Sequence, residues 1–549
     1  MLHHMGVKKA ILAAVIVAFG GYAQAADYAG SIRGTVKDAS GAPVAGAFVK
    51  VKNAEKRLTF MVVSQAQGRY TANQLPPGKY TVQGIGSGFE SALSPEVQVA
   101  SQSATVDVSL TTRLGPAYPP GWPGDPGGRQ MWRYDQPALE PVAGAGQETL
   151  KTKCTQCHNL SRVLIYRVER SSWDATINKM RNYIKGMPGA TDLTEQEAAT
   201  LLDYMSTNYG ALERPHPNSR LPRGLMSGDG LKYRVVDFEL PEKDSMPHDG
   251  TVDFEGNGWV GETGNGHLGK LDVKTLEYTR IPVPPVGSKP GNVSNVWTSP
   301  EGTIWTVDNT NRLVIEHDPK SGRFTTWEAP KESMKAMGAN TMVFHPDGTR
   351  WGTAIGSNQV WKLDPKTKQF ASFDVPSGVK LGRSADPYGM AISPDGKIWF
   401  AQRSADLMGR IDPATGKIEE FPVPLPDKYI MPRRMGVDAD GNLWVGLHGV
   451  GKLMKIDYKT TKMTVYTPRQ ENGGVYMVSV DMKNNIPWMT MQHSDKIARF
   501  DPKTETFLEL PLPYPESDVR RIQADPNNPN RIWYAGEMGN RMGYIEMLP

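Results

Sequence analysis

The sequence predicts a mainly β protein with an N-terminal β-sandwich, a small all-α domain and a C-terminal seven-bladed β-propeller. Short alternating strands separated by turns fill residues 29–112, which is typical of a sandwich. Residues 145–210 show helical apolar periodicity around a pair of cysteines. Tryptophan then recurs every 44 to 48 residues to the end of the chain, and a period near 45 is typical of propeller blades.

The first 25 residues predict a cleaved export signal. Lys8 and Lys9 precede an apolar stretch, and Ala23-Gln24-Ala25 forms a small-x-small cleavage site. We therefore expect cleavage after Ala25 and a periplasmic protein. No later stretch approaches about 18 uninterrupted apolar residues, so we expect no transmembrane segment.

The composition argues against one class of partner. The chain of 549 residues has 62 basic and 58 acidic side chains and a formal charge of +4, which falls to +2 when the two signal lysines are removed. Such a balance predicts no nucleic-acid partner. The 56 glycines and 43 prolines indicate a turn-rich chain.

The N-terminal segment, residues 29–112, shows strands at 31–36, 47–51, 80–82 and 104–108. Its turns carry the motifs Gly34-Thr35-Val36, Gly41-Ala42-Pro43-Val44, Gly68-Arg69-Tyr70 and Leu75-Pro76-Pro77-Gly78-Lys79-Tyr80. In these motifs the segment resembles the carboxypeptidase regulatory-like domain. The resemblance implies a non-catalytic sandwich of the starch-binding-like class that serves as a spacer or docking module, with carbohydrate binding as the alternative. A Pro/Gly-rich linker is expected over residues 113–144.

The two cysteines of the chain stand together in Cys154-Thr155-Gln156-Cys157-His158. This spacing attaches c-type haem, because two thiols one helical turn apart can each bond a vinyl group while the adjacent histidine binds the iron. We therefore expect Cys154 and Cys157 to form the thioethers of a covalent haem c, with His158 as the proximal ligand. A zinc site would need four ligands, and no second Cys/His pair is in range. A thioredoxin-like dithiol is the alternative.

Residues 145–210 form the predicted helical domain. One apolar helix face joins Trp173, Ile177, Met180 and Ile184, and Thr194 with Glu197 predicts a capping box that opens a last helix. The segment resembles a small class I cytochrome c. The resemblance implies a methionine as sixth iron ligand shortly before the final helix, where Met187 stands. Met180 is the alternative ligand, although its place in the apolar face favours a core role.

A second linker is expected over residues 211–230, and the propeller over 231–549. Each predicted blade carries one core tryptophan: Trp259, Trp305, Trp351, Trp399, Trp444, Trp488 and Trp533. The last repeat ends without an outer strand, whereas an unpaired strand at residues 233–241 precedes the first repeat. We expect that strand to complete the seventh blade and protect its edge.

A ring of residues is expected where the innermost strands begin, around the central channel. The repeat alignment places there His248, Ser294, Asn340, Tyr388, Arg433, Tyr476 and Arg520. A ring without aliphatic members predicts a polar, ligand-binding funnel, with a merely water-filled channel as the alternative.

The repeats resemble the virginiamycin B lyase-like propellers. The motif Pro247-His248-Asp249-Gly250, followed by Glu262, carries this resemblance. It implies an elimination reaction in which His248 is the base and Glu262 is one carboxylate ligand of a magnesium ion. Met246 stands where the family has its other carboxylate, and Glu242 and Asp244 are the substitutes that the sequence offers.

The position of other histidines and of one glutamate in the repeat predicts their roles. His448, His493 and Glu537 lie near the ends of second strands and are reserve candidates for a ligand at the channel mouth, or else loop residues bonded to the backbone. His317 and His345 are expected in turns, with structural roles.

These features favour a periplasmic haem c electron-transfer protein, a redox enzyme or its subunit. Its propeller would bind a small-molecule or polysaccharide substrate, and its haem would pass electrons to a partner protein, another cytochrome or an oxidase. One alternative is a virginiamycin B lyase-like C–O lyase or hydrolase that uses His248 as base. Another is a carbohydrate- or cell-wall-binding protein with a respiratory link.

Overall fold

The computed structural model describes most of the chain after residue 27. The described residues are 28–100, 102–114, 141–154, 163, 169–185, 191–210, 224–243, 245–287, 291–330, 339–382, 384–427, 430–469, 474–515 and 517–549, without the side chains of Tyr183 and His493. The expected signal peptide, Cys157, His158, Met187 and Asp244 lie outside them. Within these ranges, no helix has both the length and the apolar character that crossing a bilayer requires.

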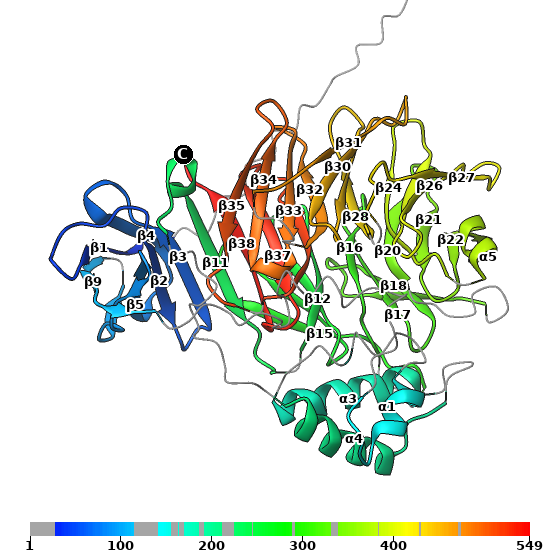
Figure 1. Ribbon diagram of the computed structural model, residues 1–549, viewed down its shortest axis with the longest axis horizontal. Helices are drawn as coiled ribbons and strands as arrows, with labels where there is room; N and C mark the ends of the chain where they lie inside the picture. The colour runs from blue at the N-terminus through cyan, green and yellow to red at the C-terminus, as the bar shows by residue number, and fades with distance from the viewer. Residues whose placement is uncertain are drawn as a thin grey trace, which may run out of the picture.

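The N-terminal domain is a sandwich of two sheets (Figure 1). One sheet joins β4, β1 and β8, with β9 also paired to β1, and the other runs β10-β6-β5-β2-β3, with β7 paired to β5. The predicted strand at 104–108 is two short strands, β8 and β9, and β3 and β4 were not expected. The bounds are β1 Gly30–Asp38, β2 Phe48–Asn53, β3 Leu58–Val63, β4 Arg69–Leu75, β5 Gly78–Gly86, β6 Phe89–Glu90, β7 Val97–Val99, β8 Ser103–Thr105, β9 Val108–Leu110 and β10 Thr112–Arg113.

The sandwich is joined to the propeller through one strand, β11 (Tyr233–Glu239). β11 pairs on one side with β3 and on the other with β38 (Arg541–Met547), so that one sheet of ten strands runs through both domains. Val236 and Phe238 belong to the same buried cluster as Ile32 and Val49 of the sandwich. The sandwich therefore shares a hydrophobic core with the propeller and is more than a spacer.

The end of the predicted second linker also packs on the sandwich. The backbone N–H of Met226 donates to the carbonyl of Gly46 at 2.9 Å, and the Gln65 side chain donates to the carbonyl of Leu231 at 2.7 Å. A short 3₁₀ helix, η3 (Gly228–Leu231), then leads into β11. Residues 224–231 thus belong to the domain junction.

The described residues form seven four-stranded antiparallel blades, as the tryptophan period predicts. Each core tryptophan lies on the second strand of its blade and is at most 2% exposed. The first three blades are β12 Pro247–Val252, β13 Gly258–Glu262, β14 His267–Leu271, β15 Tyr278–Pro282; β16 Val296–Thr298, β17 Ile304–Asp308, β18 Leu313–His317, β19 Phe324–Glu328; and β20 Ala339–Phe344, β21 Arg350–Ala354, β22 Gln359–Asp364, β23 Gln369–Asp374.

The remaining blades follow a short helix, α5 (Pro376–Leu381). Their strands are β24 Pro387–Ile392, β25 Ile398–Gln402, β26 Leu407–Ile411, β27 Ile418–Pro422; β28 Pro432–Val437, β29 Leu443–Leu447, β30 Lys452–Ile456, β31 Met463–Tyr466; β32 Val475–Asp481, β33 Ile486–Met491, β34 Lys496–Asp501, β35 Thr506–Pro511; and β36 Val519–Ala524, β37 Arg531–Gly536, β38, β11.

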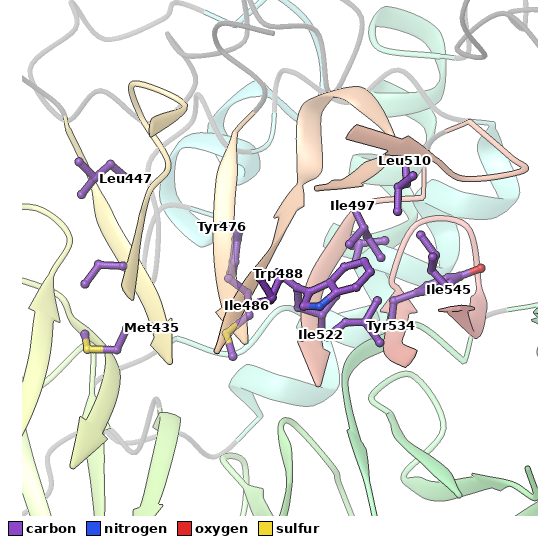
Figure 2. Close-up of a cluster of buried hydrophobic side chains, with 14 of the residues drawn as sticks. Met435, Leu447, Tyr476, Ile486, Trp488, Ile497, Leu510, Ile522, Tyr534 and Ile545 are labelled. Atoms are coloured by element: carbon purple, nitrogen blue, oxygen red, sulfur yellow. The ribbon is translucent and has the colours of Figure 1, made fainter. Parts of the chain in front are cut away.

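Neighbouring blades pack through their apolar faces. Figure 2 shows Trp488 of blade six directed toward Ile522 and Tyr534 of blade seven, all within one buried cluster. β11 supplies the outer strand of blade seven, as expected, and brings the first and last parts of the propeller chain together. The ring is therefore closed by strand pairing as well as by packing.

The third unit consists of helices α1 (Gln147–Lys153), α3 (Arg170–Ile184) and α4 (Glu195–Asn208), beside the propeller (Figure 1). The predicted capping box is present at Thr194 and Glu197. Trp173, Ile177 and Ile184 lie in the apolar core of this unit, whereas Met180 is half-buried and is not part of that core. Trp173, Ile177 and Ile184 thus form the core face that the periodicity predicts, and the core role expected of Met180 stays a prediction.

The close approach of α1 and α4 depends on Gly146. Its φ is +102°, and a Cβ there would lie 2.7 Å from the Cβ of Tyr204. Only glycine adopts this backbone without strain and leaves room for the tyrosine. The contact fixes the helix that ends at Cys154 against the last helix of the unit.

Replacing Phe238 with alanine should lower the free energy of unfolding of the intact chain by about 3 kcal/mol, since its ring is 5% exposed and stacks on Tyr278 at 5.0 Å in the shared core. Denaturant titration would measure the change. The control is Phe254→Ala, whose ring is 55% exposed and whose loss should cost less than about 0.5 kcal/mol. Equal effects of the two variants would contradict a shared core at β11.

Candidate functional site

The predicted ring of channel residues lies where the inner strands begin. His248, Asn340, Tyr388, Arg433, Tyr476 and Arg520 are each the second residue of an inner strand, and Ser294 lies two residues before β16. Tyr388, Arg433 and Tyr476 are in mutual contact, and the rest of the ring belongs to different blades around them. The repeat therefore places these side chains at one end of the channel.

A distorted backbone precedes several inner strands. Met246, Asp386, Met431 and Asp518 have φ between +47° and +54°, a left-handed conformation that residues other than glycine rarely adopt. A register shift follows at the start of the inner strand in blades one, three, four, five, six and seven. Bulges of this kind redirect side chains, and such strain gathers at functional sites.

A second layer of side chains, which the repeat alone did not predict, lies next to the ring. Asp249, fully buried, accepts hydrogen bonds from Arg434 at 2.6 Å and from Asn295 at 2.8 Å, and Arg521 lies 3.4 Å away. These residues directly follow ring positions. Burial raises the pKa of Asp249, but Arg434, His248 and Arg521 outweigh it and hold that pKa well below its usual range. The signal was present in the two Arg-Arg pairs at 433–434 and 520–521.

His248 is oriented by the same carboxylate. Its Nδ1 lies 3.0 Å from Oδ1 of Asp249. When Nδ1 carries the proton and donates to the ionised Asp249, Nε2 keeps its lone pair, which is the arrangement that a general base needs. The sequence-based assignment of His248 as a base candidate is therefore compatible with its geometry.

Tyr388 and Tyr476 form a hydrogen-bonded pair of phenols at the centre of the ring, with ring centroids 6.1 Å apart. The Arg433 guanidinium lies 4.2 Å from the Tyr476 ring centroid and donates to the Tyr388 hydroxyl at 3.3 Å. Burial raises the pKa of Tyr388, but Arg433, Arg434 and Arg403 overcome this and lower it to about 7. These guanidinium groups therefore favour the ionised form of Tyr388.

A polar network connects the tyrosine pair with the helical unit. Lys179 of α3 lies 3.4 Å from Glu537, which pairs with Arg520 at 2.6 Å, and Arg520 pairs with Asp518 at 2.8 Å. Gln492 then bonds both Asp518 and, at 2.7 Å, Nε2 of His448. The His448 ring stands edge-on to Tyr476 at 5.4 Å. Glu537 and His448, reserve candidates from the sequence, thus lie at the channel mouth.

The remaining histidines have other positions. The side chain of His493 is not described. His317 is 2% exposed and packs between Trp259 and Phe324; it lies in β18 rather than in a turn. His345 lies 2.9 Å from Asp347 and bonds the Gly396 carbonyl. Both therefore have the structural roles expected of them.

Glu262 does not fit a magnesium ligand. It is fully buried and accepts hydrogen bonds from Arg280 at 2.9 Å, Tyr278 at 2.9 Å and Ser245 at 2.8 Å. Burial raises its pKa, but the bonds from Arg280 and its neighbours outweigh that and lower the pKa. Arg280 also pairs with the exposed carboxylate of Glu242 at 3.6 Å, so the two acids share its guanidinium.

The position of Met246 adds to this mismatch. Its sulfur is 3.6 Å from the Lys179 ammonium, where a metal site would need a carboxylate. No group of three or more His, Cys, Asp or Glu in the described residues is arranged to hold a metal ion. The described residues around Glu262 therefore do not fit a magnesium site.

The fold and the channel define a seven-bladed β-propeller that shares its closing sheet with a β-sandwich. Residues 31–111 match the model of the carboxypeptidase regulatory-like domain, and residues 295–548 match that of the virginiamycin B lyase family. The chain thus carries a carboxypeptidase regulatory-like domain and a virginiamycin B lyase-like propeller. The matched range begins after blade one, so it does not include His248 or Glu262.

Solved structures show the same propeller fold. Virginiamycin B lyase from Staphylococcus aureus is 18% identical with a TM-score of 0.50, and a streptogramin B lyase is 22% identical with a TM-score of 0.51. A catalytically inactive histidine-to-alanine variant of the S. aureus enzyme, solved with quinupristin, is 18% identical with a TM-score of 0.51. Each match covers 58% of this chain and all of the other. None of the curated proteins matches the chain.

We expect one tyrosine of the native protein to ionise at about pH 7, because Arg433, Arg434 and Arg403 stabilise the phenolate of Tyr388. This ionisation should be absent from the Tyr388→Phe variant. Tyrosinate difference absorbance would measure this ionisation. The folded pKa lies below the unfolded value, so the free energy of unfolding should rise as the pH increases from about 7 to about 10.

The control for this titration is Tyr278→Phe, since burial and Glu262 raise the pKa of Tyr278 well above its usual value. That variant should leave the neutral-range ionisation intact. A titration that is the same in the native protein and in Tyr388→Phe would contradict the assignment.

Magnesium should not bind at Glu262. Excess Mg²⁺ or EDTA is expected to leave the Tm of the native protein unchanged, because a ligand raises Tm only when it binds the folded state and Arg280 already neutralises the carboxylate. Thermal unfolding with and without the ion gives the result. A rise of Tm with Mg²⁺ that disappears in Glu262→Gln would overturn this reading.

Proposed function

We propose that the protein is an exported haem c oxidoreductase in which the propeller channel binds an organic substrate and the helical unit passes the electrons to a partner cytochrome or oxidase. The observation that carries this proposal is the docking of α3 at the channel mouth. Lys179 contacts Met246 of blade one and Glu537 of blade seven, and the network from Glu537 leads to Tyr476 and Tyr388. The unit with the haem motif thus adjoins the site with the proton acceptor.

The surroundings of Cys154 are compatible with haem attachment. Cys154 caps α1 and packs, half-buried, against the apolar core that includes Leu150 and Met205. Burial raises the pKa of its thiol to about 11, which disfavours the reactive thiolate of a thioredoxin-like dithiol. A haem held by Cys154, Cys157 and His158 would supply one-electron transfer.

The channel residues would handle the proton and the charge of an oxidised substrate. Tyr388, with a pKa of about 7, accepts the proton that an organic substrate loses as it is oxidised. Arg433, Arg403 and Arg520 supply positive charge around that position and stabilise a negatively charged substrate. The Asp249 carboxylate keeps His248 in the orientation of a second proton acceptor.

A second candidate is a metal-independent lyase on the same channel. The Asp249–His248 pair favours it, because a histidine whose Nδ1 is fixed by a carboxylate abstracts protons through Nε2. The propeller fold shared with virginiamycin B lyase also favours this candidate. The absence of a suitable carboxylate at Met246 separates it from a magnesium-dependent reaction.

The pyridine haemochrome spectrum of the mature protein, produced with haem-maturation factors, tests the proposal. We expect one covalent c-type haem per chain, lost when Cys154 and Cys157 are both replaced by serine, because no thioether can then form. Met187→Ala should abolish the long-wavelength band of methionine-ligated ferric haem, and Met180→Ala is the matched control. Loss of the band only in Met180→Ala would show that Met180, and not Met187, is the sixth iron ligand.

Absence of covalent haem from the mature protein would overturn the redox proposal and leave the His248 lyase as the candidate. That lyase would then be tested by substrate turnover in His248→Ala, with His345→Ala as the control because His345 lies at a peripheral turn. These two results distinguish an electron-transfer protein from an enzyme that needs only acid and base groups.

A further inference from the structure

The channel contains a cavity below the charged layer of Asp249, Arg434 and Arg521. It has a volume of about 260 Å³ and lies toward the far ends of the inner strands, away from Met246 and the helical unit. Its apolar wall includes methionines from four consecutive blades. The main lining residues are Trp297, Met342, Met390, Met435, Met477 and Met482.

The ceiling of this cavity carries excess positive charge. Arg434 and Arg521 line it with side chains 2% and 9% exposed, and both face the single carboxylate of Asp249. None of the lining residues, all of them in the described part of the chain, is acidic. Asp249 lies closer to Arg434 than to Arg521, so the positive charge of Arg521 is only partly compensated, which costs free energy unless an anion balances it.

Three lining residues also carry a buried polar atom with no hydrogen-bond partner among the described residues. These atoms are Nε of Arg521, Nε1 of Trp297 and Oγ1 of Thr341. Buried donors are nearly always satisfied in folded proteins, so three of them around one cavity point to an acceptor that the chain itself does not supply. The Arg521 guanidinium lies 5.6 Å from the Trp297 ring, which brings two of the donors to the same wall.

We propose that this cavity binds a small apolar monocarboxylate, with its carboxylate at Arg521 and its hydrocarbon part among the methionines. The size is suitable, because an apolar cavity of about 150 Å³ already holds benzene and this one is larger. Methionine side chains adapt to varied apolar shapes. The positive ceiling excludes a soft metal cation, although thioethers alone would accept one.

The cavity is separate from the tyrosine site. Tyr388, Tyr476 and His248 are absent from its lining, and the Asp249 layer stands between them. Met482, in the turn after β32, lines the cavity and is 55% exposed, so it marks the opening toward the solvent. The inference therefore does not depend on the haem proposal.

Calorimetric titration of the intact mature protein with 3-phenylpropionate, 3-phenylpropanamide and 2-phenylethylamine tests this site. We expect one molecule of the carboxylate to bind, at least about tenfold more tightly than the amide, since a charge-assisted bond adds roughly 1.5 kcal/mol or more. The amine should not bind, because its charge is repelled by the two arginines.

Two variants at the opening locate the binding. Met482→Glu places a negative charge at the exposed mouth and should weaken binding of the carboxylate by about tenfold, whereas Met482→Gln, of similar size and uncharged, should not. Equal affinity for the amide and the carboxylate would overturn the anion assignment. Absence of binding by all three probes, or binding insensitive to Met482→Glu, would overturn the site.

Discussion

The pairing of β11 between β38 and β3 is the interaction on which the rest of the structure depends. A propeller has two chain ends to join, and here the first strand of the propeller segment completes the last blade. β11 is buried on both faces: Val235 lies in a core that joins the sandwich to blades four to seven, and Val236 lies in a core that joins the sandwich to blades one and seven. Because its second edge pairs with β3, no edge of blade seven is left open at that strand. The same strand thus closes the ring of blades and attaches the sandwich to it.

The buried layer of Asp249, Arg434 and Arg521 divides the channel into two environments. Removing three charged groups from water is costly, and the bonds from Arg434 and Asn295 to Asp249 offset only part of that cost. A propeller needs no such layer for closure, since its blades already pack through apolar faces. The charges are best explained by what they do to their neighbours. On one side Asp249 orients His248 and Arg434 helps to lower the pKa of Tyr388, and on the other side Arg434 and Arg521 line an apolar cavity.

Much of the propeller could be predicted from the sequence because one period determines both the core and the channel. The tryptophans establish the period, and residues eleven positions earlier, such as Tyr388 and Arg433, then necessarily lie at equivalent points of successive blades. Asp249 and Arg434 escaped this reasoning, because regular strands alternate their faces and the register shifts break that alternation. The neutralisation of Glu262 by Arg280 was also hidden, since it depends on the third and fourth strands of the blade rather than on any motif. The motifs of residues 29–112 predicted the sandwich fold, but they did not predict that the sandwich pairs with the propeller. The sequence of an outer strand such as β3 does not show whether its outer edge pairs with another strand.

The seam between blades one and seven also accounts for the position of the helical unit. Lys179 contacts Met246, which precedes the first inner strand, and Glu537, which follows β37, so α3 spans the junction that β11 closes. In the chain, residues 141–210 lie between the sandwich and the propeller. These two β domains meet at β11, beside the junction of blades one and seven. The ion pair joins α3 to blade seven through groups that are 13% and 7% exposed, so salt screens it weakly, and the contact with Met246 adds blade one to the same docking surface. The geometry of the channel mouth therefore depends on the same strand that unites the two β domains, and loss of that pairing would displace the helical unit from the tyrosine site as well.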